Sequence, residues 1–118
     1  MEASDILTRD DLVGPWAAPP VPWTEEDQFD EETLRADVAR ICQAGAPGLM
    51  CGATTGEFYA LEMEEFQRIS AAFVDECRSA GKPAIVGCTS TYSLGASRRA
   101  AWAREIGASA IFVGLPYW

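Results

Sequence analysis

Apolar runs alternate with amphipathic segments along most of this chain. Four short runs are almost continuously apolar, at residues 14–23, 48–52, 83–88 and 108–115. Runs of this length without alternation are typical of strands buried on both faces, as in a parallel sheet covered by helices. The first run is rich in proline, which cannot donate to a strand ladder, so we expect it to form an irregular strand.

Three helices are predicted between the runs, each ended by a glycine. Asp30 is a good N-cap for the first helix, which ends before Gly45 and buries Leu34, Val38, Ile41 and Cys42. The second helix is expected over residues 62–80, with one face formed by Phe66, Ile69, Phe73, Val74 and Cys77. The third is expected from a Ser93 cap to Gly107, with Leu94, Ala101, Trp102 and Ile106 as its apolar positions.

The order strand, helix, strand with roughly 30 residues per unit predicts an α/β fold, either a doubly wound sheet or a (β/α)₈ TIM barrel. The dinucleotide and Walker-type phosphate motifs of many doubly wound domains are absent from the sequence. A barrel typically needs about 250 residues. We therefore expect residues 1–118 to form the N-terminal part of one barrel domain, with a leading arm at 1–13 and the first four β/α units at 14–118.

The composition of the chain limits the classes of partner that it can bind. The 118 residues are 48% hydrophobic and carry a formal net charge of −9. This charge argues against nucleic acid and anionic membrane surfaces, which attract clustered Lys and Arg. No apolar run approaches the ~20 residues of a membrane span, and the first residues do not resemble a signal peptide. We expect a cytoplasmic protein.

The four cysteines lie on apolar positions, and the sequence contains no histidine. Cys42, Cys51, Cys77 and Cys88 form no C-x-x-C pair. We expect them to be small buried side chains without a metal site, and no cofactor is predicted.

Residues 52–57, Gly-Ala-Thr-Thr-Gly-Glu, follow the second apolar run. Two threonines between glycines at the carboxyl end of a parallel strand offer hydroxyls and free backbone N–H groups. Such groups suit a small carboxylate or phosphate. The alternative is that Thr-Thr-Gly only makes a turn.

Several segments occur in the order seen in one enzyme family. They are residues 14–23, 29–30, 44–46, 54–57 (Thr-Thr-Gly-Glu), 83–87 and 115–118. In these segments the chain resembles the N-terminal half of the dihydrodipicolinate synthase / N-acetylneuraminate lyase family, whose members are (β/α)₈ barrels and commonly homo-oligomers, as tetramers or dimers. They form a Schiff base between a lysine and pyruvate or another 2-oxo acid. They then make or break a carbon–carbon bond, in some cases with an aldehyde as the partner, or dehydrate a sugar acid.

The resemblance implies that Thr54 and Thr55 bind the carboxylate of the 2-oxo acid and that Gly56 permits the close turn. Thr54 is also a candidate for the family's hydroxyl relay, and Glu57 is expected to brace the loop. The family's P-Y-Y becomes Pro116-Tyr117-Trp118 here. Tyr117 and Trp118 are expected to line the substrate pocket, although the indole of Trp118 cannot relay a proton as a tyrosine would.

The family's reactive lysine lies on the sixth strand, beyond this chain. Lys82 is the only lysine, and it precedes the third apolar run, which places it at the amino end of the sheet. We therefore expect a lyase or aldolase by resemblance, with the 118 residues alone inactive. The alternatives are an inactive fragment, or a module that binds small carboxylates or assembles with partner chains.

Tyr92 follows the third run and is expected to pack or lie at the surface, with substrate contact as the alternative. Arg98 and Arg99 on the third helix are expected to be solvated or paired with acids.

Overall fold

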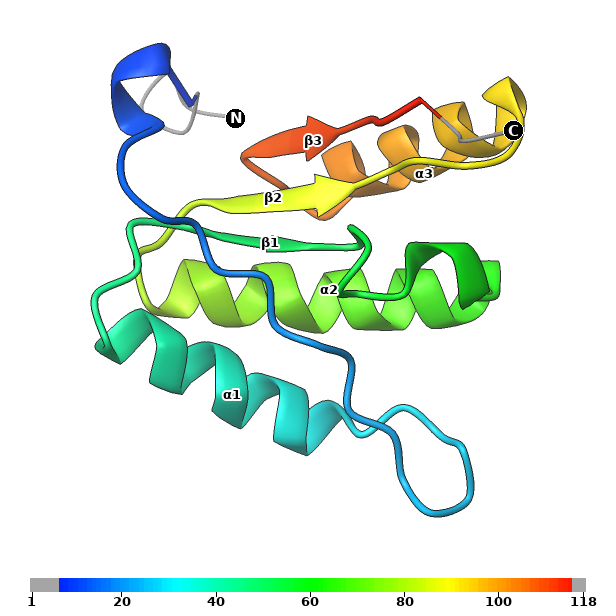
Figure 1. The fold of residues 1–118 in the computed structure, drawn as a ribbon, viewed down its shortest axis with the longest axis horizontal. Coiled ribbons are helices and arrows are strands. Elements are labelled where there is room, and N and C mark those ends of the chain that lie inside the picture. Colours follow the sequence, from blue (N-terminus) through cyan, green and yellow to red (C-terminus); the bar gives the residue numbers. More distant parts are fainter. Residues whose placement is uncertain (1–6, 116–118) are drawn as a thin grey trace.

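The computed structural model describes residues 7–115 and consists of a parallel sheet covered on one face by helices (Figure 1). Its elements are the short 3₁₀ helix η2 (Arg9–Asp11), α1 (Glu31–Gln43), β1 (Leu49–Cys51), the 3₁₀ helix η3 (Phe58–Ala60), α2 (Met63–Ser79), β2 (Ala84–Gly87), α3 (Ser93–Glu105) and β3 (Ala110–Phe112). The predicted alternation of strands and helices is confirmed.

The sheet order is β1-β2-β3, the same as the order along the chain. Both pairings are parallel, with Leu49 opposite Ala84 and Ile85 opposite Ala110. Helical crossovers join consecutive strands, so the carboxyl ends of all three strands lie at one edge, on the right of Figure 1. That edge is where we expect the candidate site.

The first apolar run does not form a strand. It makes one parallel bridge, between Ala17 and Leu49. The Ala17 N–H donates to the Gly48 carbonyl at 3.3 Å, and the Met50 N–H donates to the Ala17 carbonyl at 2.8 Å. Pro19, Pro20 and Pro22 cannot extend the ladder because they lack an N–H. The expectation of four strands is therefore wrong for the described residues, which hold three strands and two isolated bridges, this one and an antiparallel bridge between Trp23 and Phe29.

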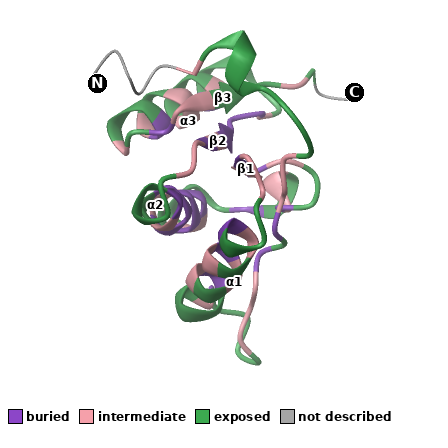
Figure 2. Ribbon diagram, turned by 90° about the vertical axis from the view of Figure 1, so that its left-hand side faces the viewer, coloured by how far each residue is buried: buried purple, intermediate pink, exposed green. Residues whose placement is uncertain are grey.

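The core lies between the sheet and the first two helices (Figure 2). Helix α2 buries the predicted face, with Phe73 and Cys77 fully enclosed. Helix α1 buries Leu34, Val38 and Cys42. Asp30 caps α1 as predicted, since its carboxylate accepts a hydrogen bond from the Thr33 N–H at 3.0 Å.

Helix α3 departs from its prediction in two respects. The N-cap is Tyr92, without a side-chain bond, and Ser93 is the first helical residue. Leu94 is 56% exposed, whereas Gly95 and Ala103 are buried. The helix therefore buries its small residues most deeply, while Trp102 and Ile106 are only partly buried against the core.

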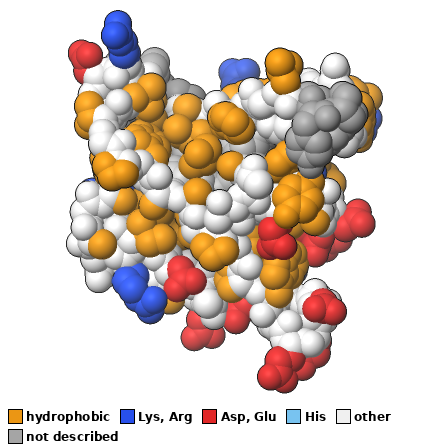
Figure 3. Space-filling model, viewed as in Figure 1, with side chains coloured by type: hydrophobic (Ala, Val, Ile, Leu, Met, Phe, Trp, Pro, Cys, Tyr) orange, Lys and Arg blue, Asp and Glu red, His pale blue; other side chains and the backbone are white. Residues whose placement is uncertain are grey.

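The sheet face opposite the helices is open. Met50 and Ile85 are paired in register and are half-buried, while their strand neighbours Leu49 and Val86 are fully buried. Successive side chains of a strand point to opposite faces, so Met50 and Ile85 lie on the open one. Hydrophobic side chains gather on this face (Figure 3), where Phe112 of β3 is 44% exposed.

None of the helices between residues 7 and 115 combines the length and apolar character that a bilayer crossing needs. The arrangement of the described residues is consistent with the N-terminal half of the expected (β/α)₈ barrel.

Candidate functional site

The Thr-Thr-Gly-Glu loop leaves the carboxyl end of β1 and enters η3. The Glu57 N–H donates to the Thr54 carbonyl at 3.0 Å, and the Phe58 N–H donates to the Ala53 carbonyl at 3.4 Å. The loop is thus closed by its own backbone. Thr54 and Thr55 are exposed on it, and neither hydroxyl bonds to another described residue. Two free hydroxyls therefore lie on a folded turn.

Glycines make this turn possible because backbone segments come too close for side chains. A Cβ at Gly56 would lie 2.8 Å from the Gly52 nitrogen. Gly52 itself has φ +72°, a left-handed conformation that favours glycine. A Cβ at Gly87, at the end of β2, would lie 2.2 Å from the Gly52 oxygen. The ends of β1 and β2 are therefore in direct backbone contact.

Glu57 ties the loop to the N-terminal segment. Its Oε2 accepts a hydrogen bond from the Trp23 Nε1 at 2.9 Å. Glu57 also has φ +56°, an uncommon conformation for a residue with a side chain. The contact agrees with a bracing role for Glu57, and it occupies one of its carboxylate oxygens.

The loop after β2 lies beside η3. Thr89 begins it and is 4% exposed. The Thr89 Oγ1 accepts a hydrogen bond from the Gly114 N–H, just beyond β3, at 2.8 Å. A cavity of about 350 Å³ lies between η3 and the start of α3, and its walls include Tyr59, Thr91, Tyr92 and Arg98. Tyr92 is 57% exposed, as its expected surface position requires.

Arg99 differs from its prediction. It is only partly exposed, and the salt bridges among the described residues involve only Arg35 and Arg40. Its guanidinium donates to backbone carbonyls of both loops and lies 4.8 Å from the centre of the Phe66 ring. Burial lowers the pKa of Arg99. The sequence carried no signal for this contact, since its partners lie far away along the chain.

Lys82 lies at the other edge of the sheet, as predicted. It precedes β2 and borders a cavity of about 610 Å³ together with Arg78, Pro47 and Ser109, near the amino ends of the strands. Thr54 and Thr55, predicted to bind the carboxylate, therefore lie at the opposite end of the strands from Lys82.

The four cysteines are buried and free, as predicted. Burial raises the pKa of Cys88 to about 11, although the nearby charge of Arg99 acts in the opposite direction. Burial also raises the pKa of Cys77 to about 12 and that of Cys51 further. These thiols stay protonated near neutral pH, which makes them poor nucleophiles. Tyr117 and Trp118, also nominated for the pocket, lie outside the described residues.

Parallel strands with helical crossovers, and a polar loop at their carboxyl ends, define the class of α/β proteins that bind ligands at that edge. The chain belongs to the dihydrodipicolinate synthetase family, whose family model matches residues 11–118.

The chain is similar to the 4-hydroxy-tetrahydrodipicolinate synthase of Methanopyrus kandleri, with 35% identity over 99 residues that cover 82% of this chain and 32% of the relative. Among solved structures, the dihydrodipicolinate synthase of Aquifex aeolicus has a TM-score of 0.83 at 26% identity, covering 89% of this chain and 35% of that one. A prophage protein of the same family from Escherichia coli K12, solved in complex with pyruvate, has a TM-score of 0.79 at 28% identity, covering 87% and 35%. This chain spans about a third of the length of these relatives.

Proposed function

We propose that this chain supplies the carboxylate-binding part of a lyase that acts on pyruvate or another 2-oxo acid through a lysine Schiff base. Thr54 and Thr55 hold the carboxylate through hydroxyl and backbone N–H groups, and Gly56 allows the turn. The amine that forms the Schiff base comes from outside these 118 residues. Family membership and the pyruvate complex of the Escherichia coli relative support the choice of ligand class.

One observation carries the proposal. The two threonine hydroxyls are exposed on a turn that is closed by backbone bonds and by glycine contacts. Donors that are already held in place bind a ligand without the entropy cost of becoming ordered. They also fix the orientation of the ketone beside the carboxylate, which is what attack by an amine requires.

Neutral donors suit this chemistry. An iminium carries positive charge, and a nearby fixed cation would oppose its formation. The turn presents hydroxyls, while the guanidinium of Arg99 is already engaged with backbone carbonyls. Thr54 could in addition pass a proton through its hydroxyl once the rest of the site is assembled.

A titration of the ¹⁵N-labelled chain with pyruvate, followed by NMR, tests the proposal. We expect the amide signals of residues 52–57 to shift. Methyl pyruvate, the neutral ester, should leave them in place because it lacks the carboxylate. Thr54→Val and Thr55→Val should each raise the Kd for pyruvate about tenfold or more, because each removes a hydrogen bond to a charged group.

Thr33→Val is the control, since Thr33 is an exposed threonine on α1 whose hydroxyl donates to Asp30 Oδ2 at 2.8 Å and is not used by the proposal. It should bind pyruvate as the unsubstituted chain does. Shifts confined to other parts of the chain, or equal shifts with methyl pyruvate, would contradict the assignment of the carboxylate to this turn.

A further inference from the structure

We propose that Arg99 is a positioning residue that holds the Thr-Thr-Gly-Glu loop against the loop after β2. The proposal concerns the geometry of the loop, and its consequence for ligand binding rests on the function proposed above.

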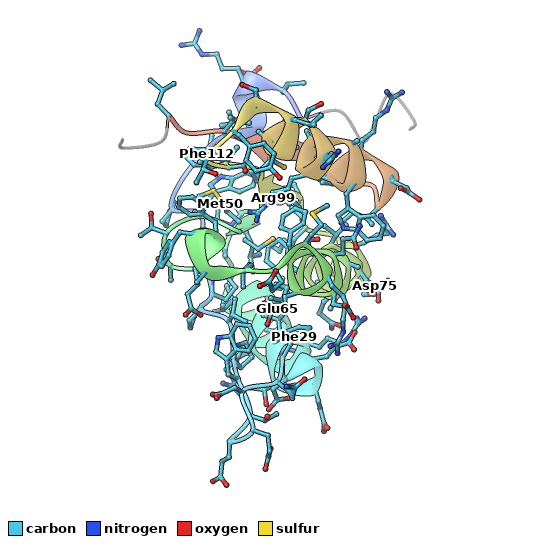
Figure 4. All side chains as sticks on the ribbon, turned by 90° about the vertical axis from the view of Figure 1, so that its right-hand side faces the viewer. Phe29, Met50, Glu65, Asp75, Arg99 and Phe112 are labelled. Carbon is cyan, nitrogen blue, oxygen red and sulfur yellow. The ribbon has the colours of Figure 1, made fainter. Side chains whose placement is uncertain are left out.

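The contacts of Arg99 join two separate loops. Its Nη1 donates to the Phe58 carbonyl at 3.3 Å and to the Thr89 carbonyl at 3.4 Å, and its Nη2 donates to the Leu61 carbonyl at 3.3 Å. Phe58 and Leu61 bracket η3, whereas Thr89 follows β2. Viewed from the carboxyl ends of the strands, Arg99 lies centrally between α3 and the segment that leads into α2 (Figure 4).

Backbone hydrogen bonds join the loop to η3. Glu57 accepts from the Ala60 N–H at 2.9 Å and donates to the Thr54 carbonyl at 3.0 Å. A side chain that holds the carbonyls of Phe58 and Leu61 therefore also holds the turn that presents Thr54 and Thr55. The end of a short helix leaves carbonyls unpaired, and Arg99 supplies the donors.

The same contacts extend to β3. Thr89, whose carbonyl accepts from Arg99, also accepts at Oγ1 from the Gly114 N–H at 2.8 Å. A chain of hydrogen bonds thus runs from Gly114 through Thr89 and Arg99 to Phe58. It links the segments that follow the carboxyl ends of the three strands.

Arginine is specifically required for this arrangement. Its planar group can donate in several directions while one face lies on an aromatic ring, here Phe66 at 4.8 Å. Lysine has a single ammonium group and cannot reach both loops in the same way. An arginine that merely filled space would not need its donors aimed at three carbonyls.

Residue-resolved amide hydrogen exchange of the full 118-residue chain tests the proposal. In Arg99→Leu we expect exchange at Glu57, Ala60 and Gly114 to accelerate about tenfold or more relative to amides in α1. Arg99→Lys should give a smaller local acceleration. Arg104→Leu, on the exposed side of the same helix, is the control and should leave the loop amides unchanged.

Equal acceleration in the loop and in α1 would overturn the proposal, because it would show only lower overall stability. Loop exchange in Arg99→Leu that matches Arg104→Leu would overturn it as well. If Arg99→Leu does not fold, loop amide exchange in Arg99→Lys is compared with that in Arg104→Leu, and equal exchange would overturn the proposal. The Kd for pyruvate should rise several-fold in Arg99→Lys while the free energy of unfolding stays close to that of the control.

The two proposals can fail separately. If the unsubstituted chain shows no pyruvate-dependent shifts in residues 52–57, the carboxylate assignment fails, and the exchange comparison still decides whether Arg99 positions the loop.

Discussion

At the residue scale, the candidate site depends on three glycines, which have no Cβ atom. Gly52, Gly56 and Gly87 bring two strand ends and one turn into backbone contact. The sequence indicated that Gly56 permits a close turn. It did not indicate the contact between Gly87 and Gly52, because these residues meet only when β1 pairs with β2.

Gly87→Ala should destabilise the chain by about 1–3 kcal/mol, as overpacking does, since the new Cβ would press on backbone that cannot rotate away. Urea unfolding monitored by tryptophan fluorescence measures the change. Gly114→Ala is the control, because its Cβ would have only ordinary contacts, the nearest at 3.5 Å. Equal unfolding midpoints for the two variants would show that the strand ends separate freely.

The residues predicted well from sequence are those whose partners are close in the chain. Asp30 caps a residue three positions ahead. Arg99 bonds to Phe58 and Leu61, 41 and 38 positions away, so no local sequence pattern predicts these hydrogen bonds. Thr54 and Thr55 were nominated through a motif, and their role stays a proposal.

At the element scale, α1 and α2 were predictable because each has one continuous apolar face. Helix α3 was predicted over nearly the same residues, but its buried face was not, because its buried positions are Gly95 and Ala103. Small residues allow close packing without an apolar signature. The attachment of α3 instead includes a polar contact, in which Trp102 Nε1 donates to Ser70 Oγ on α2 at 3.0 Å.

A double-mutant cycle of Ser70→Ala and Trp102→Phe should give an interaction energy of about 0.5–1.5 kcal/mol, the net contribution of one hydrogen bond. Ser70 is 1% exposed and donates to the Phe66 carbonyl at 2.6 Å, so its oxygen is held in place to accept from Trp102. Denaturant unfolding of the four proteins supplies the cycle. Costs that simply add would show that the helices are held together by packing alone.

At the scale of the whole molecule, the sheet has two ends with different contents. The carboxyl edge carries the threonine turn, Thr89 and Arg99, and the amino edge carries Lys82. The alternation of elements predicted the parallel sheet and hence these two edges. The same alternation predicted a first strand that does not form, since proline lacks the N–H donors that a strand ladder needs.

Incubation with pyruvate and borohydride should leave Lys82 unmodified, because its side chain is at the edge opposite the proposed carboxylate site. Peptide mass spectrometry before and after reduction checks this, with Lys82→Arg as the control for adducts elsewhere. A pyruvate-dependent adduct on Lys82 that disappears in Lys82→Arg would contradict the assignment of the two edges.

The strand order β1-β2-β3 also has a consequence for how the protein is made. Each strand pairs with the strand that precedes it in the chain, as Ala84 does with Leu49 and Ala110 with Ile85. No described strand has to wait for a partner synthesised much later, so the closure entropy of each pairing stays modest. Strands can therefore be added one at a time to a surface that already exists, and the glycine contact between β1 and β2 can form before α3 packs onto the sheet.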